Sequence, residues 1–294
     1  MKKLIVITGG AGFVGSNLIE YLLKYEKNIK IISLDNYSSG TKKNHINSPH
    51  VIYLRGDTKK ISKILKKQKD KIHSLFHFGE FSRIYQSFIN MKECIDSNNI
   101  GTLEVFNFCL ENKIKLIYSA TSATIGNSGK DKNLSPYAFS KAKNLEFLEN
   151  LKKWFNFKFE IIYFFNVYGN RQIFKGKMAT VIGIFENQYK NKQSLTVVKP
   201  GTQSRRFTHI SDTIKTCYYA WKKNKNKHYS ISNKKSYSII QVAKMFKTKI
   251  KFLAPRKGER YASALTNMNL SNRVYKHFGK IQLKSYISDI INTK

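Results

Sequence analysis

A glycine-rich turn between an apolar run and a helix-like segment most constrains what this chain can fold into. The apolar residues 4–7 are followed by glycines at three-residue intervals: Gly9, Gly12 and Gly15. One glycine makes the tight turn, one lets the backbone approach a pyrophosphate, and one lets the next helix pack closely on the strand. That helix starts near Phe13 and Val14 and points its N-terminal N–H groups at the anion. The combination predicts a dinucleotide site; a tight turn without a ligand is the alternative.

The second apolar run agrees with this prediction. The apolar residues 29–34 are followed directly by Asp35, which lies 20 residues after Gly15. A carboxylate there accepts both hydroxyls of an adenosine ribose and repels a 2′-phosphate. The next residue, Asn36, is neutral, although lysines follow at 42 and 43. We therefore expect NAD rather than NADP, with a simple strand-end role for Asp35 as the alternative.

Charge and cysteine content narrow the class of protein. The formal net charge is +35, but lysines are spread along the whole chain together with Asn and Ile. This pattern is typical of an A/T-rich coding background, so we expect no nucleic-acid partner. The cysteines Cys94, Cys109 and Cys217 have no metal-ligand spacing, which predicts no metal, no disulfide and a cytoplasmic location. No apolar run approaches the length of a membrane span, so we expect no membrane partner.

Strand-like and helix-like runs alternate through the first half of the chain. This order predicts an α/β fold with a Rossmann-type, doubly wound parallel sheet. We expect the sheet domain in residues 1–165, completed by about 204–232. The regularity weakens after residue 166, so residues 166–203 and 233–294 are expected to form a smaller α+β substrate lobe.

A tyrosine and a lysine four residues apart supply the predicted chemistry. Tyr137 and Lys141 fall on a predicted helix, where positions i and i+4 share a face. A nearby cation lowers the pKa of a phenol, which can then take a proton from a hydroxyl while hydride leaves the same carbon. The hydroxyl-rich segment 119–124 precedes them, and Thr121 or Ser122 can hydrogen-bond the reacting oxygen. Taken alone, Tyr137 and Lys141 could equally be an ordinary exposed i,i+4 pair on a helix.

In this order, the motifs resemble those of the extended short-chain dehydrogenase/reductase family, and in particular the NAD-dependent nucleotide-sugar epimerases and dehydratases. The resemblance covers nearly the whole chain and is to UDP-glucose 4-epimerase-like enzymes of this family. It implies that NAD is held by twelve residues: Gly9, Gly12, Phe13, Val14, Gly15, Asp35, Asn36, Asp57, Thr58, Phe78, Tyr137 and Lys141.

The same resemblance implies a sugar-diphosphate site. The loop after His77 matches a family loop but departs from its usual small residues, and the signature N-x-G-T recurs at 99–102. The substrate contacts implied are Glu80, Ser82, Arg83, Asn166, Arg205 and Arg260. The nucleotide base is expected to meet variable residues between about 174 and 200, such as Phe174, Leu195 and Val197.

The arginines argue separately for a diphosphate. Only eight of the 53 basic residues are Arg, yet four of them fall in two short segments: Arg205, Arg206, Arg256 and Arg260. Arg offers a planar fork for phosphate oxygens that Lys cannot copy. The clustering predicts diphosphate binding, with chance clustering as the alternative.

The resemblance implies oxidation of a sugar C4 hydroxyl as the first step, followed by epimerisation or release of the 4-keto sugar. A 4,6-dehydratase needs an Asp–Glu pair directly after the catalytic Thr, and residues 119–130 contain no acid. Glu80 could substitute, so the dehydratase stays as an alternative, as does a catalytically inactive nucleotide-binding protein. UDP, GDP and dTDP sugars are all open, and the implied role is synthesis of capsule or other surface polysaccharide precursors.

The resemblance also implies a homodimer or higher homo-oligomer. Its contact would be built from the helix after Asn99 and the helix that carries Tyr137. Apolar residues on the second helix are either part of that contact or part of the core: Phe147, Leu148 and Leu151.

Overall fold

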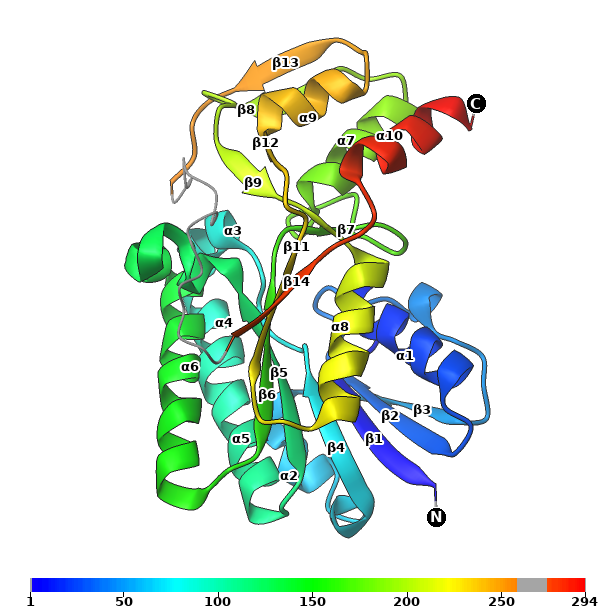
Figure 1. The fold of residues 1–294 in the computed structure, drawn as a ribbon, viewed down its shortest axis with the longest axis vertical. Helices are drawn as coiled ribbons and strands as arrows, with labels where there is room; N and C mark the ends of the chain where they lie inside the picture. The colour runs from blue at the N-terminus through cyan, green and yellow to red at the C-terminus, as the bar shows by residue number, and fades with distance from the viewer. Residues whose placement is uncertain (1, 258–273, 294) are drawn as a thin grey trace.

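A computed structural model describes residues 2–257 and 274–293 and shows a large lobe below a smaller one (Figure 1). The large lobe is built on an eight-stranded sheet, ordered β14-β11-β6-β5-β4-β1-β2-β3, in which every neighbouring pair is parallel. Its strands are β1 (Lys3–Thr8), β2 (Ile29–Asp35), β3 (Val51–Arg55), β4 (Ile72–His77), β5 (Lys115–Thr121), β6 (Phe159–Phe164), β11 (His228–Ser232) and β14 (Val274–Phe278). The predicted Rossmann-type sheet is confirmed.

Helices cover both faces of this sheet (Figure 1). Alternate strand residues point to opposite faces, so Ile5 and Ile7 join one core and Val6 the other. The first core packs against α1 (Phe13–Tyr25) and α8 (Ile210–Lys223). The second packs against α2 (Ile61–Ile64), α5 (Thr102–Glu111) and α6 (Pro136–Phe155).

Shorter helical elements complete the large lobe. They are α3 (Ile84–Ile89), α4 (Met91–Ile95), the 3-10 turns Lys42–Asn44, Thr58–Lys60, Lys69–Lys71, Ser122–Thr124 and Gly126–Asn133, and a π-helical turn at Asp96–Gly101. The start of α6 follows from its sequence: the Ser135 hydroxyl accepts the Ala138 N–H at 3.1 Å, and Pro136 occupies the first helical turn. This start places Tyr137 at the helix N-terminus.

The small lobe has its own apolar core, which includes Tyr168, Phe185, Leu195, Val197 and Phe246. Its elements are α7 (Val181–Lys190), α9 (Ile239–Met245), α10 (Leu283–Asn292) and two strand pairs, β8 (Leu195–Val198) with β13 (Ile250–Leu253) and β9 (Ser204–Arg206) with β12 (Ser236–Ser238). A further pair, β7 (Val167–Tyr168) with β10 (Thr208–His209), lies at the junction.

Two strands pair outside the lobe expected for their range. The range 233–294 was expected in the small lobe, but β14 forms the edge of the main sheet, where it pairs with β11. Of the range 204–232 expected in the large lobe, α8 and β11 do belong there, whereas β9 pairs with β12 in the small lobe. The chain therefore crosses between the lobes more often than its pattern indicated.

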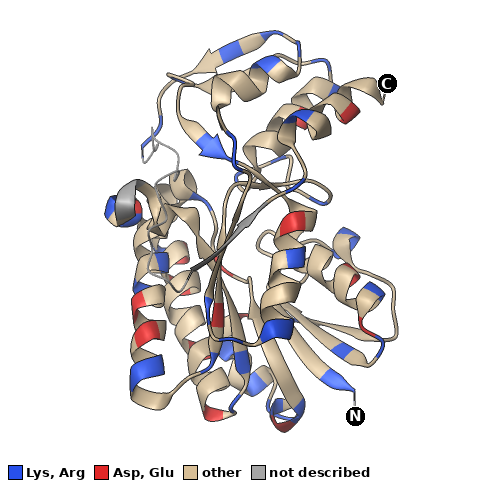
Figure 2. Ribbon diagram, viewed as in Figure 1, with Lys and Arg blue, Asp and Glu red and all other residues tan. Residues whose placement is uncertain are grey.

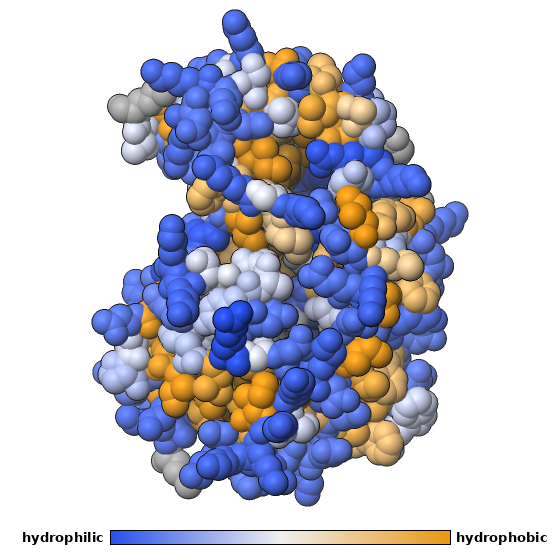
Figure 3. Space-filling model, turned by 180° about the vertical axis from the view of Figure 1, so that it is seen from behind, coloured by the Kyte–Doolittle hydropathy of each residue, from blue (hydrophilic) through white to orange (hydrophobic). Residues whose placement is uncertain are grey.

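Lys and Arg residues are spread over elements of both lobes in the ribbon of Figure 2. From behind, the surface is indented between the lobes and mixes apolar patches with hydrophilic ones (Figure 3). Among the described helices, none is long and apolar enough to cross a membrane.

Candidate active site

A cavity of about 500 Å³ opens at the carboxyl ends of the main strands, between the two lobes. In open parallel sheets ligands bind at this edge, and the volume falls in the range typical of small-molecule sites. The predicted catalytic, cofactor and substrate residues that the structure describes all line this one cavity. Arg260 lies outside the described residues.

The glycine turn has no room for side chains. Gly9 has a φ of +70°, and a Cβ on it would approach the Gly79 nitrogen to 2.8 Å. A Cβ on Gly15 would lie 2.2 Å from the Gly9 oxygen, so α1 packs directly on the turn. Gly12 is more open, because a Cβ on it would lie 3.1 Å from the Gly9 oxygen. Gly9 and Gly15 are thus needed for the fold, and Gly12 leaves backbone facing the cavity.

Asp35 is fixed beside this turn at the end of β2. Its Oδ2 accepts the Ala11 N–H at 2.9 Å and its Oδ1 accepts the Tyr37 N–H at 2.8 Å. Burial raises the pKa of this carboxyl, against the backbone N–H groups that lower it. The nearby Asp57 caps a 3-10 turn, because its Oδ1 accepts the Lys59 N–H at 2.9 Å. Two carboxylates therefore lie on the part of the wall formed by β2 and β3.

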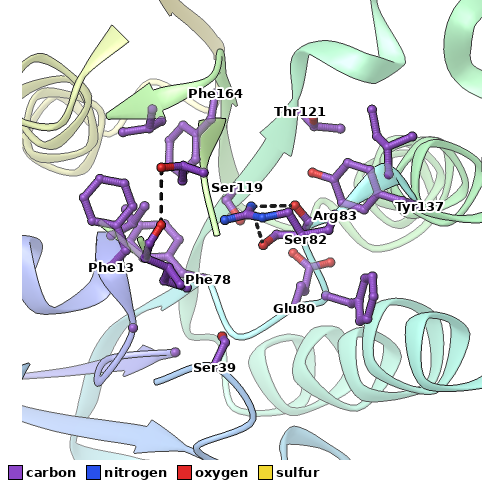
Figure 4. A pocket seen from close by; sticks show the side chains of 18 of the residues that line it. Phe13, Ser39, Phe78, Glu80, Ser82, Arg83, Ser119, Thr121, Tyr137 and Phe164 are labelled. Atoms are coloured by element: carbon purple, nitrogen blue, oxygen red, sulfur yellow. Dashed lines mark hydrogen bonds between the residues drawn. The ribbon is translucent and has the colours of Figure 1, made fainter. Parts of the chain in front are cut away.

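The predicted catalytic residues meet where β5 ends and α6 begins. Tyr137 is 9% exposed, and its hydroxyl points into the same part of the cavity as Arg83 (Figure 4). Thr121 is the last residue of β5, and Ser122 opens the following 3-10 turn. A sugar hydroxyl placed here can meet the phenol and both hydroxyls.

The ammonium of Lys141 has three acceptors, one for each of its N–H groups. These are Glu80 Oε2, the Ser119 carbonyl oxygen and, at 3.2 Å, the Tyr118 hydroxyl. Burial lowers the pKa of Lys141, and the Glu80 carboxylate acts in the opposite direction. Lys141 is thus held on the protein side of the cavity wall.

Glu80, expected from the resemblance to meet the substrate, turns both of its oxygens to protein groups. While Oε2 pairs with Lys141, Oε1 accepts from Tyr118 at 3.0 Å, Thr102 at 3.1 Å and Asn144 at 3.4 Å. Its side chain is 3% exposed. A carboxylate offers about four lone-pair positions, so these four donors occupy them.

A chain of hydrogen bonds supports Glu80 from behind. Thr102 donates to Glu80, so its oxygen accepts from His77 Nε2 at 2.9 Å. The other ring nitrogen, Nδ1, lies 2.7 Å from Thr8 Oγ1, which also accepts the Phe78 and Gly79 N–H groups. Burial lowers the pKa of His77 to about 4, which keeps the ring neutral. The chain links the glycine turn to the Glu80–Lys141 pair.

Asparagines of the π-helical turn anchor the loop that carries Glu80. Asn98 Oδ1 accepts the Phe81 N–H at 2.7 Å, and its Nδ2 donates to the Phe81 oxygen and to Ser140 Oγ. Asn99 Nδ2 donates to the Ser140 oxygen and to Asn144 Oδ1. The signature around residue 99 therefore clamps the cavity loop to α6.

Arg83 enters the cavity from the same loop. Its Nε and Nη2 donate to the Met178 oxygen, and its Nη1 donates to the Ser82 oxygen and, at 3.3 Å, to Ser82 Oγ. Burial lowers the pKa of this guanidinium, and Tyr137 raises it. Among the described residues no carboxylate lies within ion-pair distance of Arg83.

The small lobe brings further predicted residues to the opposite wall. Asn166 donates to the Arg206 oxygen at 2.8 Å, and Arg205 is 8% exposed with its Nη1 donating to the Ser204 oxygen. Arg256 also lines the cavity, over the ring of Tyr85 at 5.1 Å. The arginine clustering in the sequence thus corresponds to two arginines on one wall.

The residues expected to contact the nucleotide base do not line the cavity. Leu195 and Val197 are fully buried in the small-lobe core, and Phe174 is 52% exposed away from the lining. The alternate residues of the same strand, Thr196 and Val198, line the cavity. The short β8 gave no pattern that fixed which face is inside.

Sequence reasoning also missed the residues around the Glu80–Lys141 pair: His77, Thr102, Tyr118 and Asn144. Asn144 lies three residues after Lys141 on α6, a spacing that places both on one face. Thr102 closes the N-x-G-T signature at 99–102, but the signature did not indicate a contact with Glu80. Tyr118 had no comparable signal, since only the sheet brings it to Glu80.

Residues 5–232 match the model of the NAD dependent epimerase/dehydratase family. The chain belongs to this family. It is 28% identical to a putative UDP-glucose 4-epimerase of Methanocaldococcus jannaschii, over 98% of this chain and 97% of that protein. Members of this family depend on NAD.

Solved structures agree on the fold. The UDP-N-acetylglucosamine 4-epimerase of Methanobrevibacter ruminantium superposes with a TM-score of 0.82 at 25% identity, over 100% of this chain and 97% of that one. The dTDP-glucose 4,6-dehydratase of Streptomyces venezuelae superposes with a TM-score of 0.87 at 18% identity, over 98% and 96%. Enzymes of both reaction types therefore share this architecture.

Proposed function

We propose that this chain uses NAD to oxidise the C4 hydroxyl of a nucleotide-diphospho-sugar and then returns the hydride, as a 4-epimerase. The observation that carries the proposal is the convergence of Tyr137, Thr121 and Ser122 on one cavity with the glycine turn and Arg205. When bound, NAD supplies the hydride acceptor. Family membership and the names of the relatives support this reaction class.

NAD fits the residues present. The tight glycine turn offers backbone N–H groups at the start of α1 to a pyrophosphate. Asp35 keeps lone pairs beside its two backbone donors for ribose hydroxyls.

The protein's own part is proton transfer and positioning. Tyr137 takes the proton of the C4 hydroxyl as that carbon loses hydride, and it returns the proton when the 4-keto group is reduced. Thr121 and Ser122 hydrogen-bond the reacting oxygen, and Asn166 and Arg205 hold the diphosphate. Release of the 4-keto sugar instead would make the chain a 4-dehydrogenase.

Absence of a suitable acid argues against the 4,6-dehydratase. Within the described part of the cavity wall, the carboxylates are Asp35, Asp57 and Glu80. The first two lie at the ends of β2 and β3, and Glu80 is fully occupied by protein donors. None is left to remove water across C5–C6.

The test is incubation of purified protein with UDP-, GDP- and dTDP-sugars in deuterated water, followed by NMR of the products and NADH absorbance. Inversion at C4 without deuterium at C5 is expected. Deuterium at C5 with loss of water would establish the dehydratase, and a stable 4-keto product with NADH would establish the dehydrogenase. Turnover of none would favour an inactive nucleotide-binding protein.

Two variants make the assignment specific. Tyr137→Phe is expected to lower turnover by about 10²–10⁴-fold, the usual contribution of a general base. Tyr163→Phe is the matched control, because Tyr163 is a buried tyrosine that bonds His228 on β11, away from the cavity lining. Full activity in Tyr137→Phe would refute the proposed base.

We also propose a homodimer through the outer faces of α5 and α6. Of the residues expected there as either contact or core, Leu148 and Leu151 are core, and Phe147 is partly buried against that core. Apolar side chains next to these helices are exposed: Ile100, in the π-helical turn that leads into α5, is 48% exposed, and Phe139 on α6 is 43% exposed. Such exposure of large apolar groups favours a protein contact.

A further inference from the structure

Arg83 places a positive charge in the part of the cavity where the sugar is proposed to react. The residue lies in the loop that joins β4 to α3 and is partly buried. In Figure 4 its guanidinium and the hydroxyl of Tyr137 reach into the same part of the cavity. A nucleotide sugar with its C4 hydroxyl at Tyr137 therefore has the groups around C4 beside Arg83.

The guanidinium of Arg83 is held in place by uncharged groups. Its Nε donates to the Met178 oxygen at 2.9 Å, and its Nη1 donates to the Ser82 oxygen at 2.8 Å and to Ser82 Oγ at 3.3 Å. Its Nη2 also donates to the Met178 oxygen. A guanidinium has five N–H donors, so one N–H of Nη2 has no acceptor among the described residues.

The carboxylates that line the described part of the cavity are committed elsewhere. Asp35 and Asp57 lie where the adenosine of NAD is expected, at the ends of β2 and β3. Glu80 shares a loop with Arg83, but its ion pair is with Lys141, and its other oxygen accepts from uncharged donors. A cation taken partly out of water is costly unless an anion faces it. The anion opposite Arg83 is therefore expected to come from a ligand.

The phosphates of the cofactor and substrate are proposed to bind elsewhere in the cavity. The pyrophosphate of NAD is placed at the glycine turn, and the substrate diphosphate at Asn166 and Arg205 on the small-lobe wall. An anion at the reacting end must then belong to the sugar itself. The carbons next to C4 are C3 and C5, and C5 carries C6. A carboxylate at C6, or one attached through the C3 oxygen, would lie beside the reacting carbon.

Building on the proposed function, we propose that the substrate is an acidic nucleotide sugar whose carboxylate, at C6 or on the C3 oxygen, pairs with Arg83. The contacts with Met178 and Ser82 fix the guanidinium, and the remaining Nη2 N–H is offered to the carboxylate. A neutral sugar leaves the cation without its anion, so the site discriminates against neutral sugars. Arg83 is thus a specificity-determining residue.

The test is isothermal titration of protein loaded with NADH, which cannot accept a hydride from the sugar, with matched pairs of nucleotide sugars. UDP-glucose and UDP-glucuronate differ only at C6, and UDP-N-acetylglucosamine and UDP-N-acetylmuramate differ only at the C3 oxygen. GDP-mannose and GDP-mannuronate repeat the C6 comparison with another base. We expect the acidic member of one kind of pair to bind about 10–150-fold more tightly, the usual effect of a hydrogen bond to a charged group. That pair then locates the carboxylate.

Variants of Arg83 separate its charge from its contact with Met178. Arg83→Met is expected to remove the preference for the acidic sugar and to leave binding of the neutral sugar unchanged. Arg83→Gln keeps an amide donor for the Met178 oxygen without the charge, so it is expected to lose the preference as well. Arg83→Lys keeps the charge and is expected to retain part of the preference. A merely structural role would weaken both members of each pair equally.

Two other arginines serve as controls. Arg205→Met is expected to weaken acidic and neutral sugars by the same factor, because both members of a pair carry the same diphosphate. Arg171→Met is the matched control, since Arg171 pairs with Glu20 at 2.8 Å outside the cavity lining. Binding of both sugars should be unchanged in that variant.

The proposal is overturned if the neutral member binds as tightly as the acidic one in every pair, or if folded Arg83→Gln keeps the full preference. Because binding is measured without turnover, this failure is distinct from failure of the proposed reaction. Inversion at C4 of a neutral sugar that binds as well as its acidic counterpart would support the 4-epimerase and refute the acidic substrate. Tight binding of the acidic sugar without inversion in NAD-loaded protein would support the substrate class and refute the reaction.

Discussion

Gly15 offers the sharpest test of how the cofactor turn is built. In Gly15→Ala the new Cβ would lie 2.2 Å from the Gly9 oxygen and 2.7 Å from the Gly10 Cα, where ordinary contact begins at 3.4 Å. Both neighbours are backbone, and Gly9 is itself wedged against Phe78 and Gly79. The turn therefore has no side chain that can move aside.

The expected cost combines this overlap with a small opposing gain. Overpacking costs about 1–3 kcal/mol and more against backbone, whereas Ala in a helix gains roughly 0.5–1 kcal/mol over Gly. We expect a net loss of about 2 kcal/mol in the free energy of unfolding, which lowers the Tm by roughly 3–5 °C for a chain of this size.

Gly12→Ala is the matched control. Gly12 has a φ of −81°, which Ala adopts freely, and its Cβ would meet only the Gly9 oxygen at 3.1 Å. We expect its Tm to stay within about 2 °C of the wild type, since a shift of a few tenths of an ångström relieves the contact. NAD affinity should fall in both variants, because both glycines line the cavity.

Urea and thermal unfolding measure the stability, and isothermal titration with NAD measures the affinity. A Gly15→Ala protein as stable as the wild type would refute the packing argument. A Gly12→Ala protein that keeps full NAD affinity would refute the placement of the pyrophosphate at this turn.

The remaining predictions concern the ribose contact, acid stability and assembly. Asp35→Ala should weaken NAD binding about 10–100-fold by calorimetry, because a charge-assisted hydrogen bond is worth about 1.5–3 kcal/mol; unchanged affinity would exclude the ribose contact. His77 binds a proton at about 4 when folded and at about 6.5 when unfolded, so its contribution is full above pH 6.5 and is lost as the pH falls through that window. Urea unfolding at pH 5 should show about 2 kcal/mol less stability from this residue than at pH 7, and a slope that His77→Gln does not reduce would contradict the assignment. Ile100→Glu should convert the proposed dimer to monomer in light scattering, while Ile52→Glu, at an equally exposed apolar position on β3, should not.

The parts of the site that depend on contacts within a few residues could be predicted from the sequence. The glycine turn, Asp35 and the start of α6 depend on contacts within a few residues or on one strand–helix unit, so composition and spacing reveal them. Strand and helix alternation predicted the sheet for the same reason.

Misassigned features depended on pairing over long distances. Nothing near β14 indicates that it joins β11 instead of the small lobe, because that choice is made by strand pairing. The inward face of β8 was read one residue out of phase, since a four-residue strand gives too little alternation to fix which side is buried.

By itself, the sequence determined that the predicted catalytic and cofactor residues reach the cavity, because each of their motifs carries its own turn, cap or strand end. Only the tertiary structure decided how those residues share charge. Tyr137 and Lys141 are neighbours on one helix, but the loop after β4 brings Glu80 to Lys141 and Arg83 to the side of Tyr137. Electrostatic partners are set by distance through space, and sequence spacing gives that distance only within a single element.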